Sequence, residues 1–170
     1  SEFANDILRH GDFAVYPVEP IIRHGAAVRV EKQPDATALL EETVHTIRKW
    51  QQDGYETIAV ICREEKEAAE LAEQLKSYME IVDCNPGTTE FGDGVMVLSV
   101  AYTKGLEFDA VLLYDPTQKK YPADNGHVKL LYVAATRALH ELVVLYHGNL
   151  SRILTDPVSK EKKQKVFAAE

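Results

Sequence analysis

The sequence predicts an α/β fold with a mostly parallel sheet and helices on both of its faces. Apolar runs of strand length alternate with amphipathic helical stretches, the order that builds parallel sheets. Several of these runs, such as TIAVIC at 57–62, are continuously apolar, as is typical of strands that are covered on both faces. The composition, 45% apolar and 27% charged, is that of an ordinary globular domain.

The first half of the chain supplies two strands and two helices. Residues 26–32 alternate apolar and polar side chains and predict a short strand. Asp35 is expected to cap the helix that follows, and Gly54 to end it. The run 57–62 predicts the next strand. The stretch 64–79 predicts an amphipathic helix with acids in its first turn, where the helix dipole favours them.

The second half continues the same alternation. Apolar runs predict strands at 80–84, 95–100, 109–115 and 141–148. LLYVAATRAL lies between the last two of these runs and predicts an almost wholly buried helix over 127–138. An arginine near the end of such an apolar helix needs an explanation.

Three regions are expected along the chain. Residues 1–25 begin helix-like, become irregular at Pro17 and Pro20, and are interpreted as a lead-in from a preceding part of a larger protein. Residues 26–155 form the α/β unit. Residues 156–170 are a charged tail, which we expect to be flexible.

Charge and cysteine content exclude several classes of protein. The net charge of −8 argues against a stand-alone nucleic-acid binder, which usually presents a basic face. No apolar run approaches the roughly 20 residues that cross a membrane, and the first residues do not resemble a secretory signal. The two cysteines, Cys62 and Cys84, lack metal-ligand spacing. We therefore expect a cytoplasmic protein with no membrane or metal site.

Two segments carry the candidate chemistry. TKGLEFD (103–109) leads into an apolar strand, and YVAATRA (132–138) leads into another. This ordered pair resembles the fifth and sixth motifs of the UvrD/Rep-type superfamily 1 DNA helicases, and within that family the helicase IV (HelD-like) proteins. The resemblance implies the second, C-terminal RecA-like motor lobe, without the phosphate-binding loop.

The resemblance also implies roles for four residues at a site for ATP and Mg²⁺, which the first motor lobe of the same polypeptide would hold. Arg137 matches the arginine finger, a role that suits a permanently charged planar fork. Glu107 matches the contact to the ribose, Gly105 a close backbone approach, and Lys104 a phosphate-side residue. Ligands of parallel sheets bind at the carboxyl ends of strands, so we expect these segments there.

Each of these residues also has a simpler interpretation. Arg137 could offset the carbonyl end of its helix, Glu107 could be a solvated acid, and Gly105 could serve only a turn. Tyr132 and Thr136 are interpreted as packing and helix-end hydrogen bonds, and the histidines as surface or hydrogen-bonded residues.

Three residues are candidates for single-stranded DNA: Arg63, Tyr102 and Thr103. Arg63 follows a strand, where the family tends to place an arginine, but an ion pair with Glu64 or Glu67 is an equally good interpretation. Tyr102 could stack on a base or pack internally.

The sequence departs from the family in three ways. It has no GxxxxGK[ST] loop, so the chain alone is not expected to bind ATP tightly or hydrolyse it. The large accessory domain before the fifth motif is absent. Ala101, Tyr102 and Thr103 stand where the family commonly has a histidine and a serine. The principal hypothesis is the motor lobe of a DNA helicase. The alternatives are a HelD-like ATPase that remodels RNA polymerase and a non-catalytic binding module.

Overall fold

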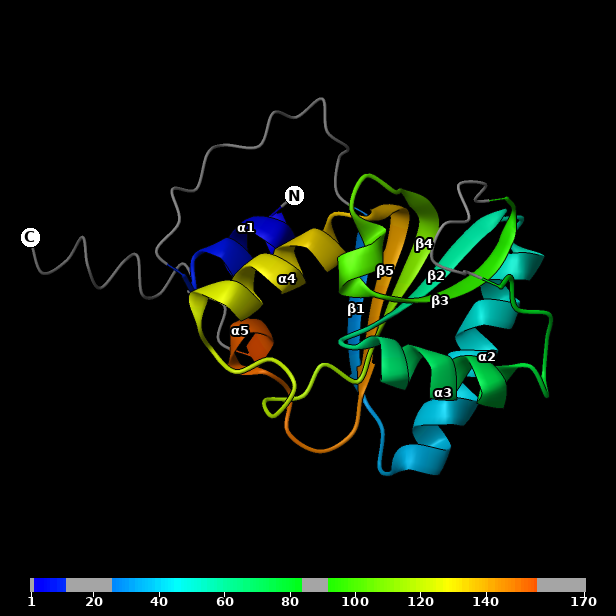
Figure 1. Cartoon of the computed structure of the whole chain (residues 1–170), viewed down its shortest axis with the longest axis horizontal. Helices are drawn as coiled ribbons and strands as arrows, with labels where there is room; N and C mark the ends of the chain where they lie inside the picture. The colour runs from blue at the N-terminus through cyan, green and yellow to red at the C-terminus, as the bar shows by residue number, and fades with distance from the viewer. Residues whose placement is uncertain (1, 12–25, 84–91, 156–170) are drawn as a thin grey trace, which may run out of the picture.

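The computed structural model describes residues 2–11, 26–83 and 92–155. Five parallel strands form one sheet in the order β1-β5-β4-β2-β3. Helices cover both of its faces (Figure 1), so the predicted fold class is confirmed. The elements are α1 (Glu2–Leu8), β1 (Ala27–Lys32), α2 (Ala36–Gln52), β2 (Thr57–Cys62), α3 (Glu65–Leu75), β3 (Gly94–Ser99), η1 (Val100–Thr103), β4 (Phe108–Tyr114), α4 (Asn125–Ala135), β5 (Ala138–Tyr146) and α5 (Arg152–Thr155).

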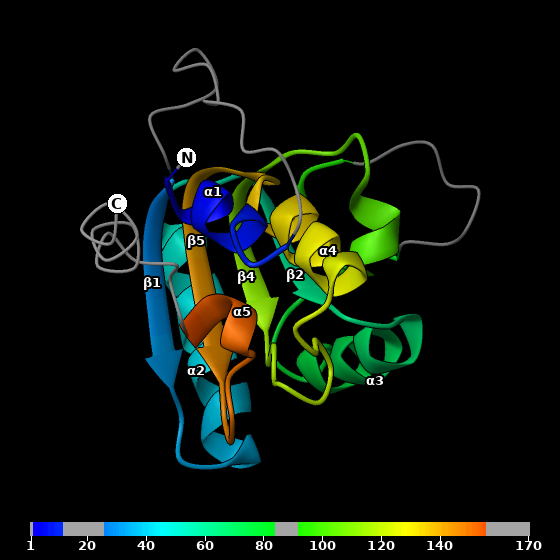
Figure 2. The same ribbon diagram turned by 90° about the vertical axis from the view of Figure 1, so that its left-hand side faces the viewer.

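The sheet separates two apolar cores. One core lies under α2 and α3 and is centred on the buried side chains of Ile47, Trp50 and Leu71. The other lies under α1, α4 and α5 and includes Leu131 and Ile153. Figure 2 shows these two helical layers on opposite sides of the strands. Because β2 to β5 face both cores, the side chains in the middle of each strand are buried, which explains the continuous apolar runs there.

Local signals in the sequence are confirmed at α2. The Asp35 carboxylate accepts a hydrogen bond from Ala38 N at 2.8 Å and so caps the first turn. Gly54 follows the helix with a φ of +88°, a conformation that favours glycine. Strand and helix boundaries elsewhere differ from the predicted ones by a few residues.

One prediction about the strands is corrected. Residues 80–83 form no strand, although Val82 N donates to Val95 O of β3 at 2.8 Å. Cys84 lies outside the described residues. Helix α1, within the predicted lead-in, packs on the unit, and its Ala4 and Ile7 side chains are buried against α4. The rest of the predicted lead-in, 12–25, and the tail 156–170 lie outside the described residues.

Candidate functional site

The two motif segments meet at the amino edge of the sheet. Glu107 directly precedes β4 and Arg137 directly precedes β5. These strands are neighbours, with Phe108 paired to Ala138, and Phe108 N donates to the Arg137 carbonyl at 2.9 Å. Segments that lie about thirty residues apart in the sequence are therefore in direct contact.

The predicted location at the carboxyl ends of the strands is wrong for Arg137 and Glu107. Helix α4 starts at the carboxyl edge, after the loop that follows β4, and carries the chain back to the amino edge, where β5 begins. The connection from β3 to β4 makes the same return through η1. The carboxyl-end rule describes ligands that a sheet holds in its own loops. It does not cover residues that directly precede a strand, as Glu107 and Arg137 do.

A tight turn fixes the fifth-motif segment. Leu106 N donates to the Thr103 carbonyl at 3.0 Å. Lys104 has φ −59° and ψ 127°, and Gly105 has φ +78°. These are the angles of a type II turn, whose third residue must tolerate positive φ. Gly105 thus forms a turn that requires positive φ, and a Cβ built there would have no atom within 4 Å. The open space leaves room for a ligand beside the backbone.

Oxygen atoms from both motifs hold the Arg137 guanidinium. Its Nε donates to the Val133 carbonyl at 3.0 Å, and one terminal nitrogen donates to Thr136 Oγ1 at 3.0 Å. The other terminal nitrogen reaches the carbonyls of Thr103 and Leu106 at 3.5 and 3.4 Å. Arg137 thus satisfies carbonyls at the end of α4, as the simpler interpretation holds, and also ties the fifth-motif turn to the sixth-motif helix.

The remaining motif residues divide into structural and exposed groups. Thr136 Oγ1 donates to the carbonyls of Tyr132 and Val133, both at 3.0 Å, which confirms its helix-end role. Lys104 and Glu107 are exposed. The amino edge therefore carries the partly buried Arg137 guanidinium, the exposed Lys104 ammonium and the exposed Glu107 carboxylate around a glycine turn.

A second group of charged residues lies at the opposite, carboxyl edge. Arg63 follows β2, its backbone N donates to Glu67 Oε1 at 3.1 Å, and its guanidinium lies 6.0 Å from the centre of the Tyr121 ring. Within the described chain Arg63 forms no ion pair, because Glu67 is paired with Lys120 instead. The ion-pair interpretation of Arg63 is not supported.

The Lys120 network is a feature that the sequence did not reveal. Lys120 Nζ contacts Glu67 and lies 3.0 Å from Asp115 Oδ2, while His147 N donates to Asp115 Oδ1 at 3.1 Å. Burial by itself lowers the pKa of Lys120. The hydrogen bonds to Glu67 and Asp115 together raise this pKa by more than burial lowers it, so the pKa of Lys120 lies above its ordinary value. Asp115 adopts a φ of +51°, uncommon outside glycine. No sequence spacing signals this network, since Glu67 and Lys120 lie on different elements.

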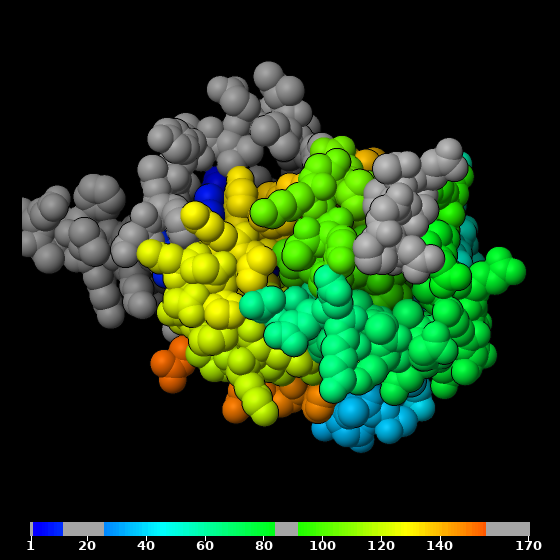
Figure 3. Space-filling view, in the orientation of Figure 1, coloured from blue at the N-terminus to red at the C-terminus, as the bar shows by residue number. Residues whose placement is uncertain are grey.

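Arg63, Glu67 and Lys120 border a hollow of about 800 Å³ between the start of α3 and the loop before α4. In the space-filling view the two segments lie against each other on one face of the molecule (Figure 3). The hollow has a mixed charge. Its lining residues are Arg63, Glu64, Lys66, Glu67, Glu70, Lys119, Lys120, Pro122 and His127.

The other two predicted nucleic-acid residues have different environments. Tyr102 is 43% exposed, and the neighbouring Glu65 carboxylate raises the pKa of its hydroxyl. Thr103 is fully buried, and its hydroxyl donates to the Val100 carbonyl at 2.7 Å. That burial argues against any contact between the Thr103 side chain and a nucleic acid, because both its surface and its donor are already used.

Two other kinds of site are absent from the described ranges. Residues 2–11, 26–83 and 92–155 contain no group of three or more His, Cys, Asp or Glu side chains placed to hold a metal ion. No helix in those ranges has both the length and the apolar character needed to span a membrane.

Comparison with known proteins agrees with this architecture. Residues 94–145, less than a third of the chain, match the profile of the UvrD-like helicase C-terminal domain. Among curated proteins, none matches the sequence. The matched segment contains Lys104, Gly105, Glu107 and Arg137.

Two solved structures are similar in fold. The C-terminal domain of a possible DNA helicase from Lactobacillus plantarum WCFS1 has 24% identity and a TM-score of 0.71, with 95% of this chain and 93% of that chain covered. The C-terminal domain of the DEAD-box protein Dbp5 has 14% identity and a TM-score of 0.50, with 88% of each chain covered. The fold is that of a RecA-like C-terminal helicase lobe.

Proposed function

We propose that this RecA-like lobe, with its UvrD-like helicase C-terminal segment at 94–145, completes the ATP site of a superfamily 1 motor protein. The observation that carries the proposal is the contact between the two motif segments: Arg137 bonds the turn that contains Gly105, and Glu107 leads into the neighbouring strand. The amino edge then faces a first lobe of the same polypeptide, which holds ATP and Mg²⁺.

The residues present fit one half of such a site. Arg137 stays charged at any working pH, and a planar guanidinium can neutralise charge on a phosphoryl group during its transfer. The exposed Glu107 carboxylate can accept hydrogen bonds from ribose hydroxyls. The open space beside Gly105 admits a ligand close to the backbone. ATP supplies the transferable phosphoryl group, and the phosphate-binding loop and the Mg²⁺ carboxylate belong to the other lobe.

The arginine is tested by ATPase measurements on a polypeptide that contains both lobes. Arg137→Ala should lower the turnover rate by about 10³-fold or more, while the affinity for nucleotide changes little. Arg137→Lys should remain deficient, because an ammonium cannot reproduce the guanidinium fork. Lys129→Ala, an exposed substitution on the same helix, is the matched control.

Since Arg137 also supports the structure, each variant needs a thermal melt. A loss of turnover in a variant that melts like the wild type supports the finger. Unchanged turnover in Arg137→Ala would refute it.

For the nucleic-acid side, we infer that single-stranded DNA contacts the carboxyl edge at Arg63 and at the hollow beside it. The hollow offers Lys66 and Lys119 in addition, and its acids require that other parts of the motor share the binding. Arg63→Gln should weaken single-strand binding and reduce the slope of log K against log salt by about one unit. A variant with an unchanged slope would remove Arg63 from the DNA track.

A second candidate function rests on the segment before the fifth motif. The Ala101 side chain has no polar group, the Tyr102 hydroxyl lies near the Glu65 carboxylate, whose negative charge would repel a phosphate, and Thr103 is buried. That segment therefore has little to offer a DNA phosphate, while the amino-edge group is retained. This combination favours an ATPase of the HelD-like type that remodels RNA polymerase without unwinding DNA. Duplex unwinding by the two-lobed polypeptide would support the helicase, and ATPase stimulation by RNA polymerase without unwinding would support the alternative.

A further inference from the structure

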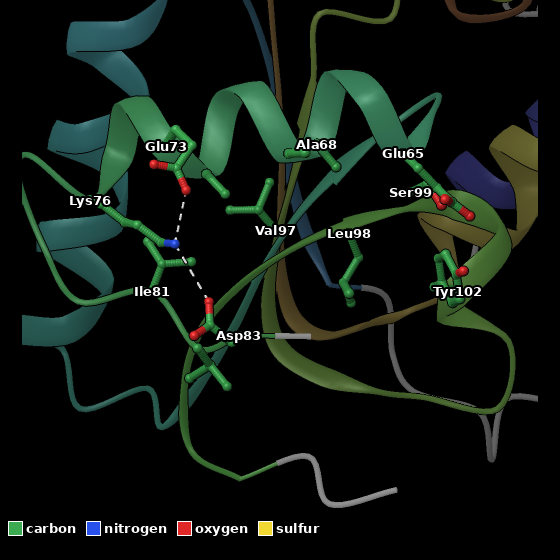
Figure 4. Close-up of a pocket in the computed structure, with 13 residues that line it drawn as sticks. Glu65, Ala68, Glu73, Lys76, Ile81, Asp83, Val97, Leu98, Ser99 and Tyr102 are labelled. Carbon is green, nitrogen blue, oxygen red and sulfur yellow. Dashed lines mark hydrogen bonds and ion pairs between the residues drawn. The ribbon is translucent and has the colours of Figure 1, made fainter. Parts of the chain in front are cut away.

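A groove runs between helix α3 and strand β3, on the opposite side of α3 from the hollow described above. Its volume is about 320 Å³. On the helix side the small side chains of Ala68, Ala69 and Ala72 line it, and on the strand side Val97 and Ser99 do so. Figure 4 shows the groove in close-up, with the helix above and the strand below. Small residues at neighbouring positions of α3 leave space where larger side chains would fill the gap.

Strand β3 is the outermost strand on this side of the sheet. Its backbone groups point alternately toward β2 and away from it. Gly94 N bonds toward β2, to Glu56 O at 2.7 Å, whereas Val95 O bonds outward, to Val82 N at 2.8 Å. By the same alternation, the backbone N–H and C=O of Val97 point outward. Past Val95, no described residue pairs with this edge.

Ser99 lies at the end of the strand and lines the groove. The residue is 3% exposed, and its hydroxyl has no hydrogen-bond partner among the described residues. A buried polar group without a partner is destabilising, so native proteins rarely retain one without a reason. A ligand in the groove would provide the missing hydrogen bond.

The two ends of the groove are acidic. At one end the Glu65 carboxylate lies beside Tyr102 and Ser99 (Figure 4). At the other end Glu73 and Asp83 share one lysine, Lys76, at 3.0 and 3.5 Å. The lysine balances only one of these two acids, so the lining carries a net negative charge. An anionic ligand is therefore disfavoured and a basic one favoured.

We propose that this α3–β3 groove binds an extended, basic segment of a partner protein. The segment would add a strand beside β3, its backbone bonding the outward N–H and C=O of Val97. Its small apolar side chains would face the alanines of α3. A lysine or arginine of the segment would reach the Glu65 carboxylate, and Ser99 Oγ would accept or donate a hydrogen bond within the same contact.

The probe for this proposal is a fluorescein-labelled, blocked heptapeptide of the sequence VAVRVAV. Its matched control, VAVEVAV, replaces the arginine with glutamate. The basic peptide should bind the 170-residue chain with a Kd on the order of 10⁻⁵ M, measured by fluorescence anisotropy. In ¹H–¹⁵N spectra the Val97 amide should shift on binding and become protected from hydrogen exchange.

Substitutions in the groove should change the affinity selectively. Ala69→Leu projects into the groove from an exposed position and should weaken binding by about 10-fold or more. Ala36→Leu, exposed on α2, is the matched control and should not affect binding. Glu65→Gln should weaken binding of the basic peptide about 3- to 5-fold, the scale of an exposed ion pair.

Ser99→Ala provides a second, independent test. It should raise the melting temperature of the free chain by roughly 2–4 °C, because the hydroxyl that lacks a partner is removed, and it should also weaken peptide binding. The proposal is overturned if the basic peptide shows no binding up to about 1 mM, or if VAVEVAV binds equally well. It is also overturned if the shifted amides lie away from β3, or if Ala69→Leu leaves peptide binding unchanged.

Discussion

Replacing Lys120 with methionine tests the buried charge network at the carboxyl edge. The Lys120, Glu67 and Asp115 side chains are 30, 20 and 8% exposed, so the ammonium is partly shielded and the Asp115 carboxylate almost wholly so. Lys120→Met keeps most of the aliphatic stem and removes the charge. The Asp115 carboxylate then keeps His147 as a partner but loses its cation.

The magnitude follows from the exposure of the pair. Breaking a fully buried ion pair costs about 3–5 kcal/mol, whereas an exposed pair contributes about 0–1 kcal/mol. The intermediate exposure of Lys120 predicts a loss of about 2 kcal/mol in the free energy of unfolding. For a chain of this size, that corresponds to a melting temperature lower by roughly 4–8 °C.

Urea denaturation at pH 7 measures this change directly. Trp50 is the one tryptophan in the sequence and is 2% exposed, so its fluorescence reports unfolding. Lys119→Met, in the same loop but exposed, is the control and should stay within about 0.5 kcal/mol of the wild type. Adding Asp115→Asn to Lys120→Met should recover part of the loss, since the uncompensated charge is gone. If Lys120→Met and Lys119→Met are equally stable, the network does not stabilise the fold.

Three further predictions concern single positions. Gly105→Ala should lower the free energy of unfolding by about 1–2 kcal/mol, because an alanine is strained at φ +78°. Gly126→Ala, within helix α4, is the control and should be neutral or stabilising. Thermal melts of the two variants measure the difference. Burial raises the pKa of the Cys62 thiol in the folded chain well above its usual 9.0. Above pH 9 the thiol of the unfolded chain therefore ionises while that of the folded chain stays neutral. This ionisation stabilises the unfolded chain, so the free energy of unfolding falls as the pH rises above 9. Between pH 7 and pH 10 the wild type should lose about 1.4 kcal/mol more than Cys62→Ala in urea titrations, and equal losses would contradict the burial effect. Thr103→Val should destabilise by about 1 kcal/mol through loss of the hydrogen bond to Val100 and leave single-strand affinity unchanged; reduced affinity with normal stability would restore Thr103 to the nucleic-acid site.

The sequence indicated which segments to examine, but not where they lie in the fold. It singled out Lys104, Gly105, Glu107 and Arg137, and in the structure Arg137 contacts the turn that contains Lys104 and Gly105. Their position at the amino edge was missed because the prediction applied a rule for ligands held in a sheet's own loops. The burial of Thr103 was also missed, since a polar residue in a loop gives no local sign of the helix that packs over it.

The sequence by itself determined the alternation of strands and helices, the burial of the strands on both faces, and the cap and stop of α2 at Asp35 and Gly54. These features depend on each residue's near neighbours, because side-chain period and backbone preference act over a few positions. Only the tertiary structure decided the strand order, the edge at which Arg137 meets Glu107, the pairing of Lys120 with Glu67, and the groove beside β3. Those features arise where crossovers bring distant segments together, and the free energy of such contacts depends on partners that no local stretch of sequence specifies.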